Sequence, residues 1–485
     1  MSQQLIINKF QYKQVHIIGI FGIGMSALAQ MLISIGVKVS GSDRDINKEE
    51  NKHIFRALTH LDIKLYPQDG SFCNNIVPDV LVYSTAIEKD NKDFTSAQEI
   101  PTIHRAEMLA SILKYKQGQG KTTLAVCGSC GKTTVTAWIS ETLYHLGNNP
   151  TMIGGGFSNL FKTDKTLGNF ISGSGDCIIF EADESDKSLL KYSPDFAIIT
   201  NIGTDHYPKN ELKVLFKEFL KNVKQAVVVS EYVYLFLGAS AFEHLSVVIF
   251  TENRDTLSGE IPISIPKWFY SDYLPNLQGI SLNIHSPDLK ILNLDIPAYG
   301  QHSAMNAIAV IAATVSFFQS DYKSSGIALQ KFNGVYRRFT YKGINLNNSS
   351  VYDDYAHNVE KIVSCIKSAQ EITENKRIFL IFQPHGFAPL KFMREKLFKE
   401  LEKVLRKNDE FIFLPVFYAG GSTSFSPSSE EVYKDYSSNG LKKYAYYASR
   451  DDVLSYINKT SKNGDLIIVC GARDNSLPRF AQKFT

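Results

Sequence analysis

The sequence predicts an α/β protein of about three domains, in which helices cover parallel sheets. Its 485 residues correspond to about three domains at roughly 150 residues each. Two strand–glycine turn–helix segments occur, one starting near residue 15 and the other near residue 122. From about residue 332, strand patterns again alternate with helical patterns. This alternation is typical of parallel sheets with helices on their faces.

The composition excludes several classes of protein. A hydrophobic fraction of 44% and a charged fraction of 21% are ordinary for globular proteins and exclude a disordered, collagen-like or coiled-coil chain. The net charge of +3 gives no reason to expect a nucleic acid or a membrane as partner. Six cysteines are too few for a disulfide scaffold, and the first four residues do not start a signal peptide. We therefore expect a cytoplasmic protein.

The first segment predicts a strand, a turn and a helix. Val15–Ile20 is apolar, glycines follow, and 25–35 has helical spacing before a short strand at 37–39. Gly19, Gly22 and Gly24 resemble a dinucleotide-binding fingerprint, with Asp43 near the place of a ribose-binding acid. However, Phe21 stands where close approach of a pyrophosphate needs glycine. A general phosphate-binding turn is favoured over NAD binding, and a turn without a ligand remains open.

The second segment predicts a phosphate loop. Thr122–Cys127 reads as a strand, and Lys132 opens a helix that runs to Leu146. A bound phosphate needs inward backbone N–H groups, a helix N-terminus, a lysine charge and a hydroxyl for Mg²⁺. The intervening residues supply all four: Gly128, Ser129, Cys130, Gly131, Lys132, Thr133 and Thr134. Cys127 and Cys130 also form a C-x-x-C pair, which we interpret as coincidental rather than redox-active.

Two further strands end in polar residues. Strand 177–180 leads into the acidic run 181–186, and strand 196–200 leads into 201–206. Carboxyl ends of parallel strands meet at one sheet edge, so these residues and the phosphate loop predict one site. Glu181 is a candidate Mg²⁺ ligand, because Mg²⁺ prefers oxygen donors. The alternative for the acidic run is a solvated loop that caps the next helix. His206 follows Asn201 and Asp205 in the second loop, and the alternative for this residue is a structural histidine.

The remaining chain is divided by one boundary and contains weaker motifs. The polar segment 115–121 predicts the first domain boundary. A helical stripe lies at 215–223, a hairpin at 280–296, and strands at 378–382, 411–414 and 466–470. His302 and Asn306 share one face of a predicted helix.

In this order, the motifs resemble the Mur ligases, the ATP-dependent amino-acid ligases of peptidoglycan precursor synthesis. The resemblance covers nearly the whole chain and lies in residues 22–26, 40–43, 104–109, 128–134, 181–186, 200–202, 334–339, 353–357 and 382–385. It is strongest for members that join L-alanine to UDP-N-acetylmuramate. A muropeptide ligase acting on the same UDP-sugar, or a nucleotide-binding paralogue without ligase activity, remains an alternative. Oligomeric state is left open.

The resemblance implies a three-domain architecture. A Rossmann-like domain, 1–116, would bind the UDP-sugar, and a P-loop ATPase-like domain, 117–330, would bind ATP and Mg²⁺. A second Rossmann-like domain, 331–485, would bind the amino acid and part of ATP. The implied reaction activates the sugar-linked carboxylate as an acyl phosphate, which the amine attacks to give an amide, ADP and phosphate. Domain closure would complete the site.

The resemblance also implies roles for single residues. Lys132 would contact the terminal phosphates, and Thr133, Glu181 and His206 would hold Mg²⁺. Asn306 would meet the adenine, and Arg338 and Asp354 would reach ATP from the third domain. The implied substrate-binding residues are Gly22, Gly24, Met25, Ser26, Ser84, His104, Arg105 and His385.

The chain departs from the family pattern mainly on the acceptor side. Gly386 follows His385 where the alanine-adding members carry arginine, and Asn358-Val359 replaces His-Pro. Gly203 and Ser303 replace an acidic residue and an asparagine. The nucleotide motifs are intact. We therefore expect acceptor binding to rely on other groups, such as His385 or Arg473.

Overall fold

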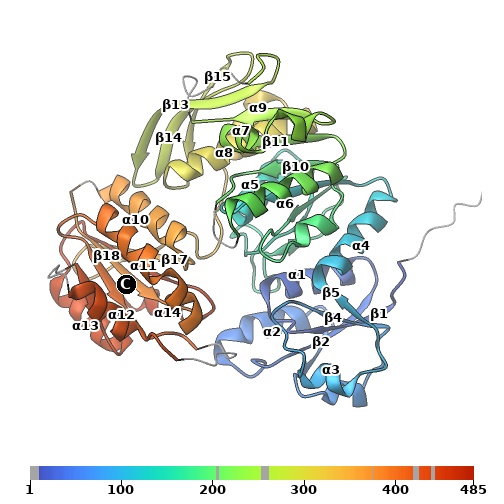
Figure 1. The fold of residues 1–485 in the computed structure, drawn as a ribbon, viewed down its shortest axis with the longest axis horizontal. Coiled ribbons are helices and arrows are strands. Elements are labelled where there is room, and N and C mark those ends of the chain that lie inside the picture. The colour runs from blue at the N-terminus through green and yellow to red at the C-terminus, as the bar shows by residue number, and fades with distance from the viewer. Residues whose placement is uncertain (1–9, 204–206, 253–260, 374, 419–424, 439–442) are drawn as a thin grey trace, which may run out of the picture. The chain divides into compact units, whose positions relative to one another are not determined.

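The computed structural model describes residues 10–203, 207–252, 261–373, 375–418, 425–438 and 443–485. Contacts divide the chain into two units. The first comprises 1–272, 282–296 and 305–334, and the second comprises 273–281, 297–304 and 335–485. The sheets and their helices are coloured along the chain in Figure 1.

The first sheet is parallel and has the strand order β3-β2-β1-β4-β5. Its strands are β1 (Gln14–Ile18), β2 (Lys38–Asp43), β3 (Lys64–Pro67), β4 (Val80–Tyr83) and β5 (Thr102–His104). Its helices are α1 (Ile23–Ser34), α2 (Lys52–Thr59), α3 (Lys92–Ser96) and α4 (Arg105–Gln117). The predicted strand–turn–helix start is confirmed. β2 continues past its predicted end at Val39 because Ser40 and Ser42 are buried in the sheet, where Ser40 Oγ lies 3.0 Å from His16 Nδ1.

The second sheet carries the phosphate loop and has the order β15-β14-β13-β12-β11-β10-β6-β9-β7-β8. Its strands are β6 (Thr122–Cys127), β7 (Thr151–Ile153), β8 (Phe170–Ile171), β9 (Cys177–Glu181), β10 (Phe196–Ile199), β11 (Ala226–Ser230), β12 (Ser246–Phe250), β13 (Lys267–Asn276), β14 (Gly279–His285) and β15 (Ile291–Ile296). Its helices are α5 (Lys132–His145), α6 (Lys209–Asn222), α7 (Glu231–Leu237), α8 (Gln301–Phe318) and α9 (Tyr322–Leu329). The strands β9, β6 and β10 lie side by side and parallel, so their carboxyl ends share one edge, as predicted.

The third sheet has the order β16-β17-β21-β18-β19-β20, with β16 antiparallel to β17. Its strands are β16 (Thr340–Ile344), β17 (Ser350–Asp354), β18 (Ile378–Gln383), β19 (Glu410–Phe413), β20 (Tyr444–Tyr446) and β21 (Leu466–Gly471). Its helices are α10 (Val359–Thr373), α11 (Phe387–Val404), α12 (Ser429–Ser437), α13 (Arg450–Thr460) and α14 (Leu477–Gln482).

This third sheet is covered on both faces. In β18, Ile378, Leu380 and Phe382 belong to one hydrophobic cluster with α10, α11 and α12. The alternate residues Phe379 and Ile381 belong to a second cluster with α13 and α14. Because successive side chains of a strand point to opposite faces, the sheet lies between two helix layers. A strand buried on both faces explains the continuous apolar run that predicted β18.

The third sheet also has a topological switch point between β18 and β21. After β18 the chain passes through α11 to β19, which is the neighbour of β18 on one side. After β21 it enters α14, which packs against β17 and β16 on the other side. The register pairs Gln383 with Gly471 at the carboxyl ends of the two strands. Ligands of open α/β sheets bind outside such a position.

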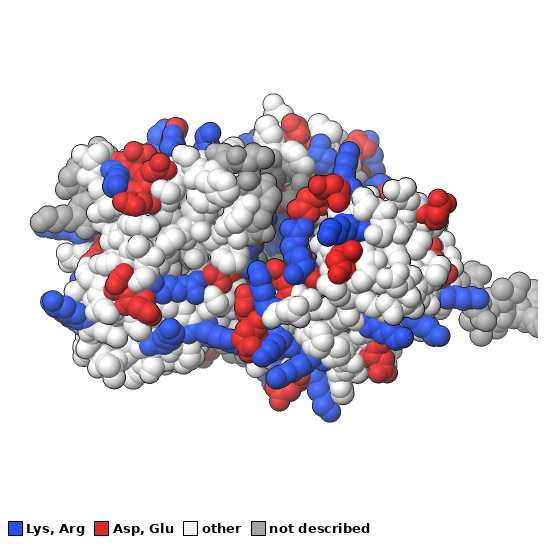
Figure 2. All heavy atoms as spheres, turned by 90° about the horizontal axis from the view of Figure 1, so that it is seen from below, with Lys and Arg blue, Asp and Glu red and all other residues white. Residues whose placement is uncertain are grey.

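The surface charges and the polarity of the helices are those expected from the composition. Lys and Arg side chains are interspersed with Asp and Glu side chains on the face shown in Figure 2, in keeping with the net charge of +3. Among the described residues, none of the helices is both long enough and apolar enough to cross a membrane.

Candidate active site

The phosphate loop follows β6 in a backbone conformation that requires glycine at two positions. Gly128 and Gly131 have φ angles of 126° and 87°. A Cβ atom on Gly128 would lie 2.3 Å from Thr200 Oγ1, and one on Gly131 would lie 2.8 Å from Asn306 Oδ1. The second distance places the Asn306 side chain directly over the loop. Asn306, predicted to meet adenine, and the phosphate loop are therefore brought together.

The loop is braced by residues that follow β10. Cys130 N donates to Asn201 Oδ1 at 2.9 Å, while Asn201 Nδ2 and Thr200 Oγ1 donate to Cys130 O at 2.9 and 2.7 Å. Gly203 N donates to Ser129 Oγ at 2.8 Å. These bonds hold the loop from the neighbouring strand and fix the direction of its remaining N–H groups.

Lys132 is buried in an acidic setting at the start of α5. Its Nζ donates to Gly128 O at 2.8 Å and to Glu184 Oε2 at 2.7 Å, and lies 3.5 Å from Asp183 Oδ1. Burial lowers the pKa of Lys132, but the charges of Asp183, Glu184 and Glu181 outweigh it and raise the pKa. Burial also raises the pKa of Asp183, but Lys132 and Ser185 lower it to about 2. Both groups are charged at neutral pH.

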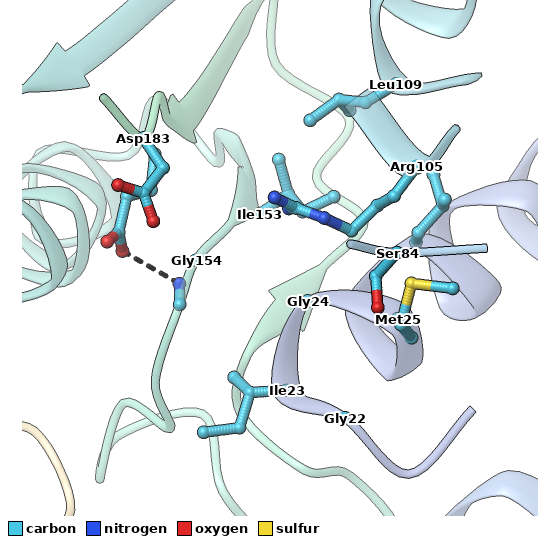
Figure 3. A pocket seen from close by; sticks show the side chains of 13 residues that line it. Gly22, Ile23, Gly24, Met25, Ser84, Arg105, Leu109, Ile153, Gly154 and Asp183 are labelled. Atoms are coloured by element: carbon cyan, nitrogen blue, oxygen red, sulfur yellow. Dashed lines mark hydrogen bonds between the residues drawn. The ribbon is translucent and has the colours of Figure 1, made fainter. Parts of the chain in front are cut away.

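Thr133 and Glu181 form a pair of oxygen donors beside the loop. Thr133 Oγ1 donates to Glu181 Oε1 at 3.3 Å, and Gly155 N donates to Glu181 Oε2 at 2.9 Å, the dashed line in Figure 3. A hydroxyl beside a carboxylate fits Mg²⁺, whose other positions phosphate and water oxygens would fill. Within the described ranges, no group of three or more His, Cys, Asp or Glu residues could hold a metal. His206 lies outside the described residues.

Five of the eight predicted substrate residues and the predicted metal carboxylate, Glu181, line one pocket of about 290 Å³ (Figure 3); the five are Gly22, Gly24, Met25, Ser84 and Arg105. Ser26 and His104 do not line it, and His385 belongs to the second unit. The first sheet and its helices contribute Gly22, Ile23, Gly24, Met25, Leu28, Ser84, Arg105 and Leu109. The second sheet and its loops contribute Ile153, Gly154, Gly155, Glu181 and Asp183. Arg105 and Asp183 are labelled on opposite sides of this pocket in Figure 3. A substrate bound by the first group would thus reach the carboxylates beside the phosphate loop.

Two predicted substrate residues form hydrogen bonds in the first turns of α1 and α4, the helices that border the pocket. Ser26 is fully buried, and its Oγ donates to Gly22 O at 3.0 Å. His104 caps α4 by accepting a hydrogen bond from Ala106 N at 3.3 Å. Each side chain therefore stabilises the first turn of a helix that contributes residues to the pocket wall. Direct substrate contact by either remains a prediction.

Asn169 is a residue that sequence reasoning missed. Its Nδ2 donates to Ile23 O at 2.8 Å and to Ser26 Oγ at 2.9 Å. Its Oδ1 accepts from Gln30 Nε2 at 2.9 Å. This fully buried amide joins the loop before β8 to the first turn of α1. A single asparagine in a loop carries no sequence signal for such a role.

The structure also bears on two alternatives. Asp43 Oδ2 accepts a hydrogen bond from Phe21 N at 2.9 Å, and Asp43 Oδ1 accepts one from Asp45 N at 2.9 Å. The carboxylate holds the glycine turn, which favours a structural role over ribose binding. Cys127 is fully buried, its Sγ donates to Ile198 O at 3.5 Å, and burial raises the pKa of its thiol. A redox role would need a thiolate, so this cysteine fits the core.

In the second unit, Asp354 organises the turn that carries Arg338. Its Oδ2 accepts from Phe339 N at 2.6 Å, and its Oδ1 accepts from Ala356 N at 2.7 Å. Arg338 lies over the Tyr355 ring, 5.8 Å from the centroid. The adjacent Arg337 is buried, with Nε 3.2 Å from Asp353 Oδ1. Asp354 therefore positions Arg338, and ATP contact by either residue remains a prediction.

A glycine loop between a parallel strand and a helix, with a hydroxyl–carboxylate pair at the helix start, defines the class of nucleotide-phosphate-binding α/β proteins. Three family models identify the particular family. They are "Mur ligase family, catalytic domain" over residues 14–117, "Mur ligase middle domain" over 126–314, and "Mur ligase, glutamate ligase domain" over 337–473. The chain belongs to the Mur ligase family.

Individual relatives match along almost the full length. A UDP-N-acetylmuramate–L-alanine ligase of Desulfosudis oleivorans is 30% identical over 95% of both chains. One of Aquifex aeolicus is 31% identical over 97% of both chains. The crystal structure of the UDP-N-acetylmuramate–alanine ligase of Thermotoga maritima is 26% identical, with a TM-score of 0.76 over 97% of this chain and 98% of that one. The predicted fold class and family are thus confirmed.

Proposed function

We propose that this protein is an ATP-dependent ligase that joins the carboxylate of UDP-N-acetylmuramate to the amine of L-alanine through an acyl phosphate. The observation that carries the proposal is the shared pocket, in which Arg105 and the glycines of α1 face Glu181 and Asp183. Full-length similarity to alanine-adding ligases supports the choice of substrates. The N-terminus of α1, at Gly22–Gly24, would receive the diphosphate of the UDP-sugar.

The proposal assigns one task to each domain. Residues 1–116 would bind the UDP-sugar, 117–330 would bind ATP, and 331–485 would bind the amino acid and part of ATP. The three matched ranges, 14–117, 126–314 and 337–473, support this division. Since ATP is an intracellular co-substrate, the proposal also assigns the enzyme to the cytoplasm.

The phosphorylation step must bring two anions together, the γ-phosphate and the sugar-linked carboxylate. Lys132 would exchange Glu184 for phosphate oxygens and offset their charge in the transition state. Asn306 and the loop N–H groups would orient the nucleotide. Thr133 and Glu181, together with His206, would hold Mg²⁺. Bound Mg²⁺ would supply charge neutralisation at the transferring phosphoryl group.

Amide formation requires a good leaving group, because a free carboxylate is a poor acylating agent. Transfer of the γ-phosphoryl group to the carboxylate oxygen releases ADP and makes phosphate that leaving group. The amine then bonds to the acyl carbon and loses a proton, and phosphate departs. Arg338 and Asp354 would complete the nucleotide site from the C-terminal domain.

Phosphate release with purified protein, ATP and UDP-N-acetylmuramate tests the proposal. The acceptors are L-alanine, L-serine, glycine and an L-alanine-initiated tripeptide, and mass spectrometry identifies the product. We expect turnover that depends on L-alanine and a product of the corresponding amide mass. Turnover only with the tripeptide would indicate a muropeptide ligase, and absence of turnover with every acceptor would indicate a paralogue without ligase activity.

A further inference from the structure

The acidic loop 182–187, which follows β9, places carboxylates beside two cations that the proposed reaction needs. Asp183 lines the pocket, and its Oδ1 lies 3.5 Å from Lys132 Nζ. Three residues further on, Asp186 Oδ2 lies 3.7 Å from Nη2 of Arg105, which lines the pocket from α4 (Figure 3). Lys132 is proposed to contact ATP, and Arg105 the UDP-sugar. Asp183 is therefore part of the nucleotide site, and Asp186 is a separate carboxylate paired with the sugar site.

The ion pair between Arg105 and Asp186 is shielded from water. Only 22% of the Arg105 side chain and 14% of the Asp186 side chain are exposed. Arg105 also packs against the first turn of α1, because a Cβ atom on Gly24 would lie 3.0 Å from Arg105 Nη1. Freely exposed ion pairs contribute little, since water screens them and both side chains lose freedom. Here the two terminal nitrogens have different neighbours, Gly24 at Nη1 and Asp186 at Nη2, which restricts the guanidinium to one orientation.

Asp186 is itself held in place by the loop that carries it. Its Oδ1 accepts a hydrogen bond from Ser188 N at 2.9 Å, which leaves Oδ2 for Arg105. The loop is also braced from the segment after β10, where the Tyr207 hydroxyl donates to Ser185 O at 2.9 Å. The carboxylate thus has a fixed direction, and it can fix the direction of the cation beside it.

A second ion pair joins the same two parts of the fold but does not reach the pocket. Lys191 ends the 3₁₀ helix Ser188–Lys191, and its Nζ lies 2.9 Å from Oε1 of Glu107 on α4. These side chains are about half exposed, at 52% and 45%, and neither residue lines the pocket. If the acidic loop served only to attach this segment to α4, both ion pairs would matter for the fold and neither would matter for the ligand.

We propose that Asp186 is a positioning residue for the ligase reaction, which holds the Arg105 guanidinium in the orientation that receives an anionic group of the UDP-sugar. The proposal rests on the function proposed above and extends it to a residue that does not itself line the pocket. A ligand that must immobilise a flexible arginine side chain loses affinity, and a carboxylate that already holds the guanidinium removes this cost. Asp186 and the ligand can share Arg105, because a guanidinium has five N–H donors.

A double-mutant cycle on Asp186 and Arg105 tests the proposal. Calorimetric titration gives the Kd for UDP-N-acetylmuramate with the full-length wild type, Asp186→Asn, Arg105→Ala and the double variant. Asp186→Asn should raise this Kd about 3- to 10-fold, the scale of immobilising one flexible side chain. In the Arg105→Ala background the same substitution should cause no further loss of affinity, because Asp186 acts only through Arg105. Asp186→Glu, which keeps the charge, should bind more tightly than Asp186→Asn, and the KM for ATP should stay unchanged in both Asp186 variants.

Glu107→Gln is the matched control, because it removes the other ion pair to α4 and should leave the Kd unchanged. Equal losses of affinity in both backgrounds would overturn the proposal, since Asp186 would then act independently of Arg105. A lower Kd for Asp186→Asn would show that Asp186 competes with the ligand, and an unchanged Kd would show that it has no part in binding. A raised KM for ATP would indicate a general loss of structure instead of positioning. Failure of the proposed function would appear in the wild type, which would then release no phosphate with any acceptor.

Discussion

Lys132 forms an ion pair with Glu184 in the structure, although the proposed reaction requires Lys132 to contact a phosphate group of ATP. Only 11% of the Lys132 side chain and 2% of the Glu184 side chain are exposed. Placement in a loop between strand and helix would suggest that Lys132 can be replaced without harm to the fold. The structure indicates otherwise, because removal of the lysine leaves a buried carboxylate without its partner.

We expect Lys132→Met to lower the rate of ligation at least about 100-fold, because the negative charge of the transition state loses the lysine that stabilises it. The free energy of unfolding should fall by about 3 kcal/mol, because Glu184 is left uncompensated. The double variant Lys132→Met/Glu184→Gln should recover most of the stability and none of the activity. Phosphate release and urea unfolding measure the two effects. Wild-type turnover by the folded double variant would contradict the assignment of the phosphate loop.

Substitution of Glu181 tests whether this residue is a Mg²⁺ ligand. Glu181→Gln keeps the side-chain shape and an oxygen that can accept from Gly155 N, but it removes the negative charge from the Thr133–Glu181 pair. The Mg²⁺ concentration for half-maximal activity should rise about 10-fold or more, because loss of a residue that only supports a metal ligand already costs about that much. Glu107→Gln, which removes an exposed carboxylate paired with Lys191, is the control. Identical Mg²⁺ titrations of wild type and Glu181→Gln would remove Glu181 from the metal site.

At the level of elements, α5 links the phosphate loop to the last segment of the first unit. Trp138 Nε1 donates to Leu329 O at 2.9 Å, and the Trp138 ring stacks on Phe332 with centroids 4.4 Å apart. Glu141 Oε2 accepts from Asn333 N at 2.8 Å, and its Oε1 accepts from Ser158 Oγ at 2.7 Å. The helix that begins with Lys132 therefore also anchors residues 329–333, just before the first unit ends at Gly334.

The anchoring carboxyl group makes stability depend on pH. Burial raises the pKa of Glu141 to about 7 from an ordinary value of 4.5. A raised carboxyl pKa means that the folded state favours the protonated form. The stability associated with that proton is fully present below pH 4.5 and is lost as the pH rises through 7.

Glu141→Gln removes this proton linkage while keeping a hydrogen-bonding side chain. Between pH 5 and pH 8, wild type should lose up to about 3 kcal/mol of unfolding free energy relative to the variant. Urea unfolding of both proteins at pH 5, 6, 7 and 8 measures the difference. A difference that stays constant across this range would show that Glu141 does not titrate there.

Local patterns predicted the elements that are apolar throughout and missed those with buried polar groups. β6 was predicted at its observed bounds, and Gly128 and Gly131 predicted a turn that their φ angles require. The end of β2 was missed because Ser40 and Ser42 look like a loop until distant partners bury them. Likewise, Asn169 donates a hydrogen bond to Ser26, which lies 143 residues earlier in the chain. No local sequence pattern near either residue predicts this contact.

For the whole molecule, motif order predicted three domains, whereas contacts divide the chain into two units. Most of the first two predicted domains lies in one unit, where Asn169 and Gln30 connect the loop before β8 to α1. Residues 273–281 and 297–304 of the second predicted domain belong to the other unit. The pocket and the phosphate loop belong to the first unit, while Arg338 and Asp354 belong to the second. Binding of the UDP-sugar should therefore depend on the first unit alone, and turnover should depend on both.

Arg338→Ala and Arg105→Ala separate these two requirements. Arg338→Ala should lower kcat at least about 100-fold, because the proposed ATP contact supplies positive charge to the transferring phosphoryl group. Its Kd for UDP-N-acetylmuramate should equal that of wild type, since every residue lining the pocket lies in the first unit. Arg105→Ala should instead weaken UDP-N-acetylmuramate binding about 10-fold or more, the scale of a lost charged hydrogen bond.

Calorimetric titration with UDP-N-acetylmuramate and a phosphate-release assay measure both effects on the same preparations. Arg394→Ala is the control for the second unit, because Arg394 is a partly exposed arginine 3.9 Å from Asp435 on the surface of that unit. It should leave both quantities unchanged. If Arg338→Ala lost UDP-N-acetylmuramate affinity as strongly as Arg105→Ala, the sugar site would require the second unit, and the division of tasks between the units would be wrong.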